Sequence, residues 1–361
     1  MKKKKAWLFI AISLALLVIS IPLSLSVGAR DIPISDLIAT LRGENINSLY
    51  APILTKRVIR TVLGLIAGLA LGTAGCVMQS ITRNPIADPS ILGVNSGAAL
   101  FVVSGIAFFG AKTPGQYIAL ALAGAGIISV LVFGIASFVP GKGAVSYNNA
   151  NPIRLALAGA AVSTACSSLI STVMLPRTNV MQVFRFWQTG SIASGTWEGI
   201  AMVLPFLLIG MGIAIWLIPS LNVIALGDDI AMGLGVKVVR TRALGALAGV
   251  LLCGACTAVA GPIGFVGLMI PHLVRAVLGG DMKTLLPLSA LDGAVLLLLA
   301  DVLGRYLGRP GELEVGIITA FLGAPVFISI VKGAKVGRKK QPKVAIHSMN
   351  ATRIVCTILK Q

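Results

Sequence analysis

The sequence is poor in charged residues, and this scarcity excludes most soluble folds. Only 12% of its 361 residues are Asp, Glu, Lys or Arg, whereas soluble domains carry roughly 25%. Hydrophobic residues make up 56% of the chain, and the mean hydropathy is +0.94. Apolar runs of about twenty residues, each long enough to cross a hydrocarbon core of about 30 Å, recur along the chain. The composition therefore predicts an all-α polytopic membrane protein.

The sequence also lacks the motifs of an enzyme. It contains no GxxxxGK[ST] phosphate-binding loop and no HExxH zinc motif, and its only histidines are His272 and His347. We therefore expect no catalytic residue, no bound metal and no cofactor in this chain. If its activity uses ATP, a separate polypeptide must bind and hydrolyse it.

Acidic residues are scarce relative to basic ones, which gives a net charge of +18. Such an excess suggests nucleic-acid binding in a soluble protein. Here the basic residues concentrate in residues 2–5 and from residue 332 onward, and basic ends beside membrane spans are typical of cytoplasmic termini. We predict cytoplasmic termini and no nucleic-acid partner. The basic C-terminal tail suits anionic membrane lipid.

Ten apolar segments are the predicted spans. They cover residues 6–27, 58–81, 91–110, 117–138, 153–175, 199–218, 243–260, 265–278, 285–302 and 315–331. The first exceeds the 7–15-residue core of a cleaved signal peptide, so we expect an uncleaved span. The eighth is short and contains a proline, a histidine and an arginine, which predicts a broken or partly buried helix. One membrane domain, 6–332, thus lies between basic tails at 1–5 and 333–361.

Glycines recur at the spacing that lets helices approach closely. Small residues four apart bring backbones together where lipid offers no hydrophobic driving force. The predicted packing glycines are Gly64, Gly68, Gly72 and Gly75 in the second span, and Gly245 and Gly249 in the seventh.

A polar turn, TRNPIADP, follows the second span. Asn84 and Asp88 each precede a proline, Pro85 and Pro89, which favours extended backbone before each proline. Asp88 is also suited to cap the next helix, with Pro89 at its first position. Together with Arg83 these residues predict a shaped turn, which the order of spans places on the cytoplasmic side. An ordinary helix connection is the alternative.

A second polar segment, residues 222–244, joins the sixth and seventh predicted spans. We expect two short helical pieces, broken at Gly233 and Gly235, with acidic residues near the start and basic residues near the end. Its regular apolar positions favour a compact helix pair that a motor protein can hold, rather than a solvated loop.

Three long motifs carry a resemblance to a known family. They are QSITRNPIADPSILGVNSGAA, GPIGFVGLMIPHLVRAVLGGDMKTLLPLSALDGAVLLLLADVLGR and ELEVGIITAFLGAPVFISIVK. Over about 26–332 the chain resembles the permeases of bacterial iron-chelate (siderophore, haem) and cobalamin ABC importers. The resemblance implies a ten-span subunit of the cytoplasmic membrane that pairs with a second copy or a paralogue. It also implies a cytoplasmic ABC ATPase dimer, which binds ATP and Mg, and an extracytoplasmic substrate-binding protein.

The resemblance assigns the second polar segment, about 224–240, to the ATPase-coupling helices. The coupling residues it implies are Leu226, Gly227, Asp228, Asp229, Ala231, Gly233, Leu234, Gly235, Val236 and Arg240. The TRNPIADP turn would then support either the ATPase interface or the inner end of the pathway.

Three arginines are candidates for docking the binding protein. Arg57 and Arg60 are three apart at the start of the second span, hence on one helix face, and Arg305 follows the ninth. The resemblance implies that they pair with acidic residues of the binding protein, which would steer docking. Arginines that reach a lipid headgroup are the alternative.

Ionisable residues inside spans are functional candidates by default. The resemblance implies that His272, Arg275 and Asp301 bond structurally to freed backbone groups. Asp292 departs from the family pattern. It is expected either to pair with Arg275 or to be a proton-active site, and the latter would suit a proton-coupled secondary transporter.

The pathway itself should be chemically bland, because a tight site would stop release of an already chelated ligand. The inner gate falls on Asn151 and Pro152 by the resemblance. The sequence thus predicts the permease subunit of an ATP-driven importer for an iron-siderophore or related chelate. Whether the cargo is a siderophore, haem or cobalamin stays open.

Overall fold

The computed structural model describes residues 2–28, 31–33, 36, 50–137 and 152–338. Every longer element in these ranges is a helix, so the predicted all-α class is confirmed. In chain order the helices are α1 (Lys2–Ser26), α3 (Tyr50–Thr82), the 3-10 helix η1 (Pro89–Leu92), α4 (Val94–Phe108), α5 (Pro114–Ser137), α6 (Pro152–Met174), α7 (Thr178–Gln188), α8 (Trp197–Trp216), α9 (Ile218–Ile224), α10 (Asp228–Gly233), α11 (Val238–Ala260), α12 (Val266–Leu278), α13 (Met282–Leu307) and α14 (Val315–Arg338).

Ten apolar helices correspond to the ten predicted spans. Seven of them (α1, α3, α5, α6, α8, α11 and α13) are long and apolar enough to cross a membrane, and three (α4, α12 and α14) contain shorter apolar stretches. The expected partial burial of the eighth segment is present, because residues 266–271 of α12 are buried around Pro271.

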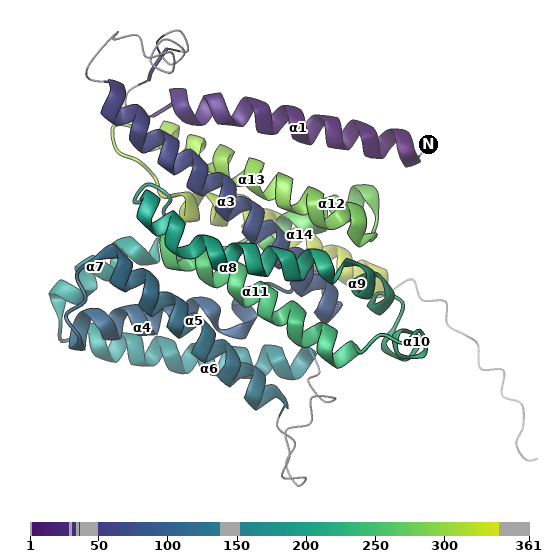
Figure 1. Ribbon diagram of the computed structural model, residues 1–361. Helices are drawn as coiled ribbons and strands as arrows, with labels where there is room; N and C mark the ends of the chain where they lie inside the picture. The colour runs from purple at the N-terminus through teal and green to yellow at the C-terminus, as the bar shows by residue number, and fades with distance from the viewer. Residues whose placement is uncertain (1, 29–30, 34–35, 37–49, 138–151, 339–361) are drawn as a thin grey trace, which may run out of the picture.

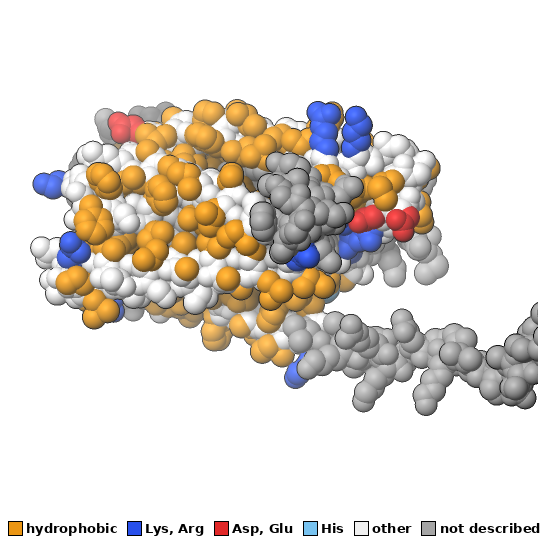
Figure 2. All heavy atoms as spheres, turned by 90° about the horizontal axis from the view of Figure 1, so that it is seen from below, with side chains coloured by type: hydrophobic (Ala, Val, Ile, Leu, Met, Phe, Trp, Pro, Cys, Tyr) orange, Lys and Arg blue, Asp and Glu red, His pale blue; other side chains and the backbone are white. Residues whose placement is uncertain are grey.

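The apolar helices lie side by side, so that the molecule has two ends (Figure 1). The short helices α9 and α10 lie at one end, with the beginning of α1 and the end of α14; we call this the α10 end. Helix α7 and the beginning of α3 lie at the other, the α7 end. Figure 2 shows apolar side chains spread over one long face, with charged side chains mainly near its two ends.

Helix α3 is the centre of the packing. It makes its most extensive contacts with α13 and α11 and also packs on α12. Helix α1 lies at the periphery against α13 and α3 and exposes much of its apolar surface. Because α3 is buried on most sides, it needs small residues where its neighbours approach.

The predicted packing glycines lie at these close contacts. A Cβ at Gly68 would overlap the backbone of Gly293 and Ala294 on α13, and one at Gly75 would overlap the backbone of Gly267 on α12. The other four lie against a neighbouring helix too: Gly64 on Leu298, Gly72 on Ser289, Gly245 on Ile81 and Gly249 on Met78. At Gly68, Gly72 and Gly75 a side chain would overlap the neighbouring backbone, whereas the other three glycines lie against side chains.

Several boundaries differ from those predicted from hydropathy. Helix α3 begins at Tyr50, before the arginines, and α13 continues to Leu307. Lys2–Lys5 belong to α1, and α14 continues to Arg338, so neither tail begins where the charge pattern changes. Helix α7 was not predicted. Charged residues continue these helices because backbone hydrogen bonding does not stop at the edge of an apolar run.

Candidate functional site

The α10 end carries a compact block of two short helices. Ile224 of α9, Ala231 of α10 and Val238 of α11 form a small buried cluster separate from the main core. Asp228 and Asp229 lie in the first turn of α10, where the helix dipole favours negative charge. The block therefore has its own packing and is held against the start of α11.

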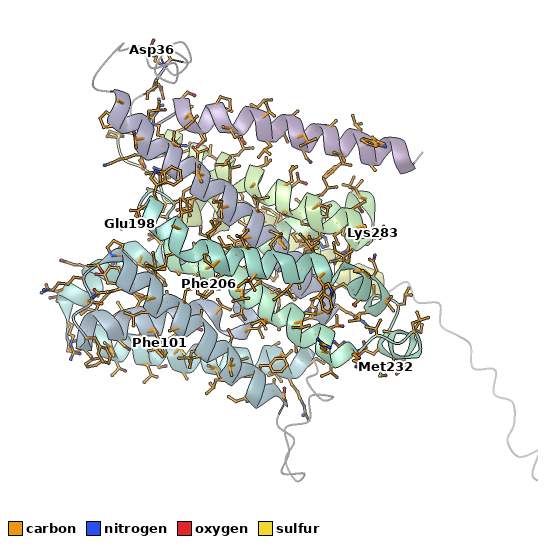
Figure 3. All side chains as sticks on the ribbon, viewed as in Figure 1. Asp36, Phe101, Glu198, Phe206, Met232 and Lys283 are labelled. Atoms are coloured by element: carbon orange, nitrogen blue, oxygen red, sulfur yellow. The ribbon has the colours of Figure 1, made fainter. Side chains whose placement is uncertain are left out.

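The opposite side of this block is apolar and exposed. Leu226, Ile230, Met232 and Leu234 are each more than half exposed, and Met232 projects from α10 away from the bundle (Figure 3). Several large apolar side chains exposed within one short segment are typical of a protein-interaction surface. We call these four residues the α10 face.

The segment is broken at Gly233 and Gly235 as predicted, but the two short helices are not the two pieces on either side of that break. They are α9 and α10, joined at residues 225–227, so the first begins before the predicted segment. Gly233 and Gly235 instead separate α10 from α11, and Gly235 has a left-handed φ of 82°. The sixth predicted span ended at residue 218, where α9 begins, so most of α9 was left in the polar segment and was not predicted as a separate helix.

Asp228 holds this block to its neighbours. Its carboxylate lies 2.9 Å from Arg83 Nη2 and 3.0 Å from Arg242 Nη2. Arg83 Nε also donates to Ile224 O at 3.0 Å, and Arg242 Nε donates to Ile81 O at 3.1 Å. The polar turn and the predicted coupling segment, far apart in the sequence, thus meet at one carboxylate.

The turn after α3 has the predicted shape. Asp88 accepts a hydrogen bond from Ser90 N at 2.9 Å and caps η1, with Pro89 at the first position. Asn84 Oδ1 accepts from Ile86 N at 3.1 Å. Burial raises the pKa of the Asp88 carboxyl. The helix that Asp88 caps is a single 3-10 turn, and α4 follows after Gly93.

A second polar contact ties α9 to α13. Asn222 Nδ2 donates to Asp281 Oδ1 at 2.9 Å, and Asn222 Oδ1 accepts from Met282 N at 2.8 Å. Asp281 also caps α13 through Lys283 N at 3.0 Å. The pKa of the Asp281 carboxyl lies below its usual value because Lys283 N–H and then the Asn222 amide donate to it.

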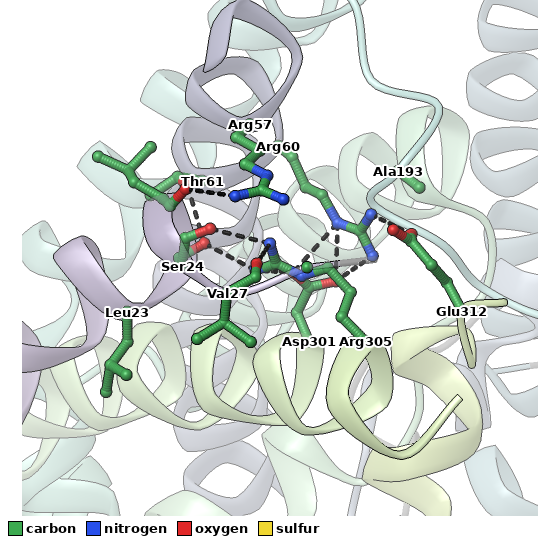
Figure 4. A network of polar contacts seen from close by, with 12 residues as sticks. Leu23, Ser24, Val27, Arg57, Arg60, Thr61, Ala193, Asp301, Arg305 and Glu312 are labelled. Atoms are coloured by element: carbon green, nitrogen blue, oxygen red, sulfur yellow. Dashed lines mark hydrogen bonds and ion pairs between the residues drawn. The ribbon is translucent and has the colours of Figure 1, made fainter. Parts of the chain in front are cut away.

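The α7 end contains a second carboxylate between two arginines (Figure 4). Asp301 of α13 lies 2.7 Å from Arg60 Nη2 and 2.9 Å from Arg305 Nη2, and Arg60 Nη1 lies 2.5 Å from Glu312. Asp301, Arg60 and Arg305 are buried. The predicted docking arginines are therefore part of an internal network that joins α3 to α13.

The same network caps the end of α1. Arg57 Nη1 donates to the carbonyls of Leu25 and Ser26, each at 2.8 Å. Arg305 Nη1 donates to the carbonyls of Ser24 (2.9 Å) and Val27 (2.6 Å). The last carbonyls of a helix have no partner within the helix and carry partial negative charge, so these arginines satisfy them.

A cavity of about 350 Å³ opens beside this network. Its lining includes Arg57, Arg60 and Arg305, which are buried, and Lys56 and Glu312, which are exposed. Docking of an acidic partner at the three arginines stays a prediction. The structure adds Lys56, which the sequence analysis missed although it directly precedes Arg57.

A larger cavity of about 780 Å³ lies between α4, α6, α7 and α14. Its lining, within the described residues, is uncharged and includes Asn95, Ser167, Ser171, Phe184 and Gln188. Hydroxyls on exposed positions of α6 donate to the carbonyl four residues earlier: Thr164, Ser168, Ser171 and Thr172. The sequence analysis missed this surface, although hydroxyls four apart in an apolar span were its signal.

The remaining predicted residues have separate outcomes. Among the described residues Asp292 forms no ion pair with Arg275, so the first of its two predicted roles was wrong; the Ser13 hydroxyl of α1 lies beside its carboxylate. The predicted gate residue Asn151 lies outside the described residues, and Pro152 begins α6. In the described part of the chain no group of His, Cys, Asp and Glu could hold a metal ion.

Comparison with known proteins identifies the family. The model of the FecCD transport family matches residues 16–333. The chain belongs to the FecCD transport family. This FecCD chain is 41% identical to the ferric enterobactin transport system permease protein FepD of Escherichia coli, over 88% of this chain and 93% of that protein. It is 40% identical to the Fe(3+)-citrate import system permease protein YfmD of Bacillus subtilis, over 89% and 93% of the two chains.

A solved structure gives the same fold. The FecCD chain superposes with a TM-score of 0.75 on an inward-facing metal-chelate type ABC transporter, at 28% identity, over 92% of this chain and 99% of that one. The resemblance seen in the motifs is confirmed. The protein is a multi-pass inner-membrane permease of the ABC importer class, a transport subunit and not an enzyme. Such permeases work with an ATPase and a substrate-binding protein.

Proposed function

We propose that this permease imports a ferric chelate, driven by ATP hydrolysis on a separate ATPase. The observation that carries the proposal is the agreement of its relatives, whose names specify ferric enterobactin and Fe(3+)-citrate import. The large uncharged cavity fits such cargo, because a chelate that must be released needs a wide and weakly binding pathway. A proton-coupled mechanism loses its support, because the family is that of ABC permeases.

The α10 end is, in this proposal, the cytoplasmic end and binds the ATPase dimer. The α10 face supplies the exposed apolar contacts, and the buried cluster behind it holds α10 against α9 and α11. ATP and Mg belong to the ATPase, and this chain binds no cofactor. Both chain termini then lie in the cytoplasm, as their basic residues favour.

The α7 end receives the substrate-binding protein. Lys56 is exposed beside a cavity whose other basic groups are held internally. Charge at an interface rim affects the association rate and orientation more than the affinity. We assign the first electrostatic contact to Lys56, with Arg57, Arg60 and Arg305 holding the surface in shape.

A second permease chain, identical or paralogous, completes the pathway. Helix α6 lines the large cavity with Ser167 and Ser171, and α14 lines it with Ile317, which is exposed. One chain therefore walls only part of the cavity. A second chain across α6 and α14 would enclose it.

Uptake by the reconstituted complex tests the function. The tagged permease is co-purified with its ATPase, placed in proteoliposomes and supplied with the binding protein and 55Fe-labelled ferric enterobactin, ferric citrate or a ferric hydroxamate. We expect ATP-dependent accumulation of one of these chelates, unaffected by a protonophore. The proposal is contradicted if accumulation continues with a hydrolysis-deficient ATPase, or if none of the three chelates accumulates.

Charge reversal at Lys56 tests the α7 end separately. Lys56→Glu should slow association of the binding protein about tenfold at low salt, with a smaller effect at high salt. Lys112→Glu, at another exposed lysine, is the matched control. Equal rates for the two variants would remove Lys56 from the docking surface.

A further inference from the structure

The cluster around Asp228 joins four elements at the α10 end. Asp228 is on α10, Arg83 follows α3 and Arg242 is on α11, while the carbonyl of Ile224 ends α9. Each arginine therefore holds the Asp228 carboxylate of α10 and a backbone carbonyl of another helix. Movement of α10 must either carry these neighbours along or break charge-assisted hydrogen bonds.

Apolar packing does not provide the same connection. The small cluster of Ile224, Ala231 and Val238 attaches α10 to α9 and α11. The link from α10 to the turn after α3 is the ion pair of Asp228 with Arg83. Since α3 is the central helix of the bundle, this pair links α10 directly to the end of the core helix, beside the contacts that α9 and α11 make.

Arg83 is held in an unusual conformation to make this link. Its φ of 49° lies in the left-handed region, which residues other than glycine rarely adopt. From this position its guanidinium reaches both Ile224 O and the Asp228 carboxylate. The turn after α3 thus holds α9 and α10 through a single side chain.

We propose that Asp228 is a positioning residue that transmits ATPase-driven movement of α10 to α3 and α11. This inference rests on the proposed function, since it requires an ATPase on the α10 face. Lys283→Gln provides the control: Lys283 lies on the first turn of α13 at the same end and is exposed, and its side chain has no hydrogen bond or ion pair within the described residues.

The experiment uses the permease–ATPase complex in proteoliposomes and needs no transported ligand. Ser171→Cys places a thiol in the large cavity. Its rate of reaction with a membrane-impermeant maleimide measures how accessible the pathway is. Cys356 is replaced by serine, and the four described cysteines are buried. The labelling rate is measured with and without ATP plus vanadate. ATPase retention and the rate of ATP hydrolysis are measured on the same complexes.

We expect ATP plus vanadate to change the labelling rate about threefold or more in the parent and in Lys283→Gln. In Asp228→Asn the change should disappear, with ATPase retention and hydrolysis within about twofold of the parent. Asp228→Glu keeps the carboxylate and should restore part of the response. A normal response in Asp228→Asn overturns the inference, and so does loss of the ATPase from that variant, because Asp228 would then serve docking.

Two further outcomes are distinguishable. If the parent complex retains no ATPase, the proposed function itself fails. If Asp228→Asn does not fold, Arg242→Lys gives the same measurement, because it keeps the charge but loses the fork that reaches both Asp228 and Ile81. A normal response in a folded Arg242→Lys complex would then overturn the inference.

Discussion

The two ends of the bundle use the same motif, one aspartate between two arginines, in different surroundings. At the α7 end the Asp301 side chain is 0% exposed and that of Arg305 is 1% exposed. At the α10 end the side chains of Asp228 and Arg83 are 36% and 38% exposed. Each motif joins α3 to another helix, so ion pairs hold α3 to its neighbours near both of its ends.

The difference in burial gives the two motifs different roles. Removing one partner of a buried pair leaves an uncompensated charge in a low dielectric, which costs about 3–5 kcal/mol. A partly exposed pair is worth about 1 kcal/mol or less and exchanges readily with water. We therefore expect the Asp301 contact to be rigid and the Asp228 contact to be exchangeable.

The largest expected effect is at Asp301. Asp301→Asn removes the negative charge between Arg60 and Arg305 and should destabilise the protein by about 3–5 kcal/mol. Thermal unfolding of the detergent-purified protein measures this. The control is Asp31→Asn, whose partner Arg309 is at the same end but exposed. If the two variants melt alike, burial does not distinguish the ends.

An intermediate effect is expected for Arg305→Lys. Lysine keeps the charge but cannot reach Asp301 and the carbonyls of Ser24 and Val27 together. Because buried carbonyls lose donors, we expect destabilisation of about 1–3 kcal/mol, with faster amide exchange at the end of α1. Unchanged exchange there would mean that Arg305 does not hold α1.

A small effect is expected for Asp228→Asn on stability. The loss should be about 1 kcal/mol or less and should shrink further as salt screens the exposed pair. The measurement is the melting temperature at low and high salt, beside Asp301→Asn. A loss as large as that at Asp301 would contradict the proposed contrast between the ends.

The smallest effect is expected for Asn222→Ala at the contact between α9 and α13. One hydrogen-bond donor to Asp281 is lost, so the pKa of this carboxyl should rise toward its usual value. Because the folded-state pKa is lowered, the contribution of Asp281 to stability is present at neutral pH and is lost as pH falls through the folded pKa. Melting temperatures at neutral and acidic pH should therefore differ slightly less in the variant than in the parent.

The sequence predicted well what depends on local pattern. Hydropathy located ten apolar helices, glycine spacing located the contacts of α3, and the Asp-Pro pair located the cap at Asp88. Each of these follows from a few neighbouring residues, because span length, small-residue spacing and capping are properties of one segment.

Pairing between distant segments was predicted poorly. Pairing with Arg275 was one of two predicted roles for Asp292, and the two side chains form no ion pair within the described residues. Arg60 was predicted to face a partner protein, and its carboxylate partner, Asp301, lies 241 positions away in the sequence. Helix α7 was missed because it is too short and too polar to register as a span.

By itself, the sequence determined the membrane class, the number of apolar helices and the family, because apolar runs and long motifs can be recognised without coordinates. Only the tertiary structure decided which charges are buried and which are exposed. Burial and ion pairing depend on which helices meet, and the same Arg–Asp–Arg chemistry is rigid in a dry interior and exchangeable at a wet surface.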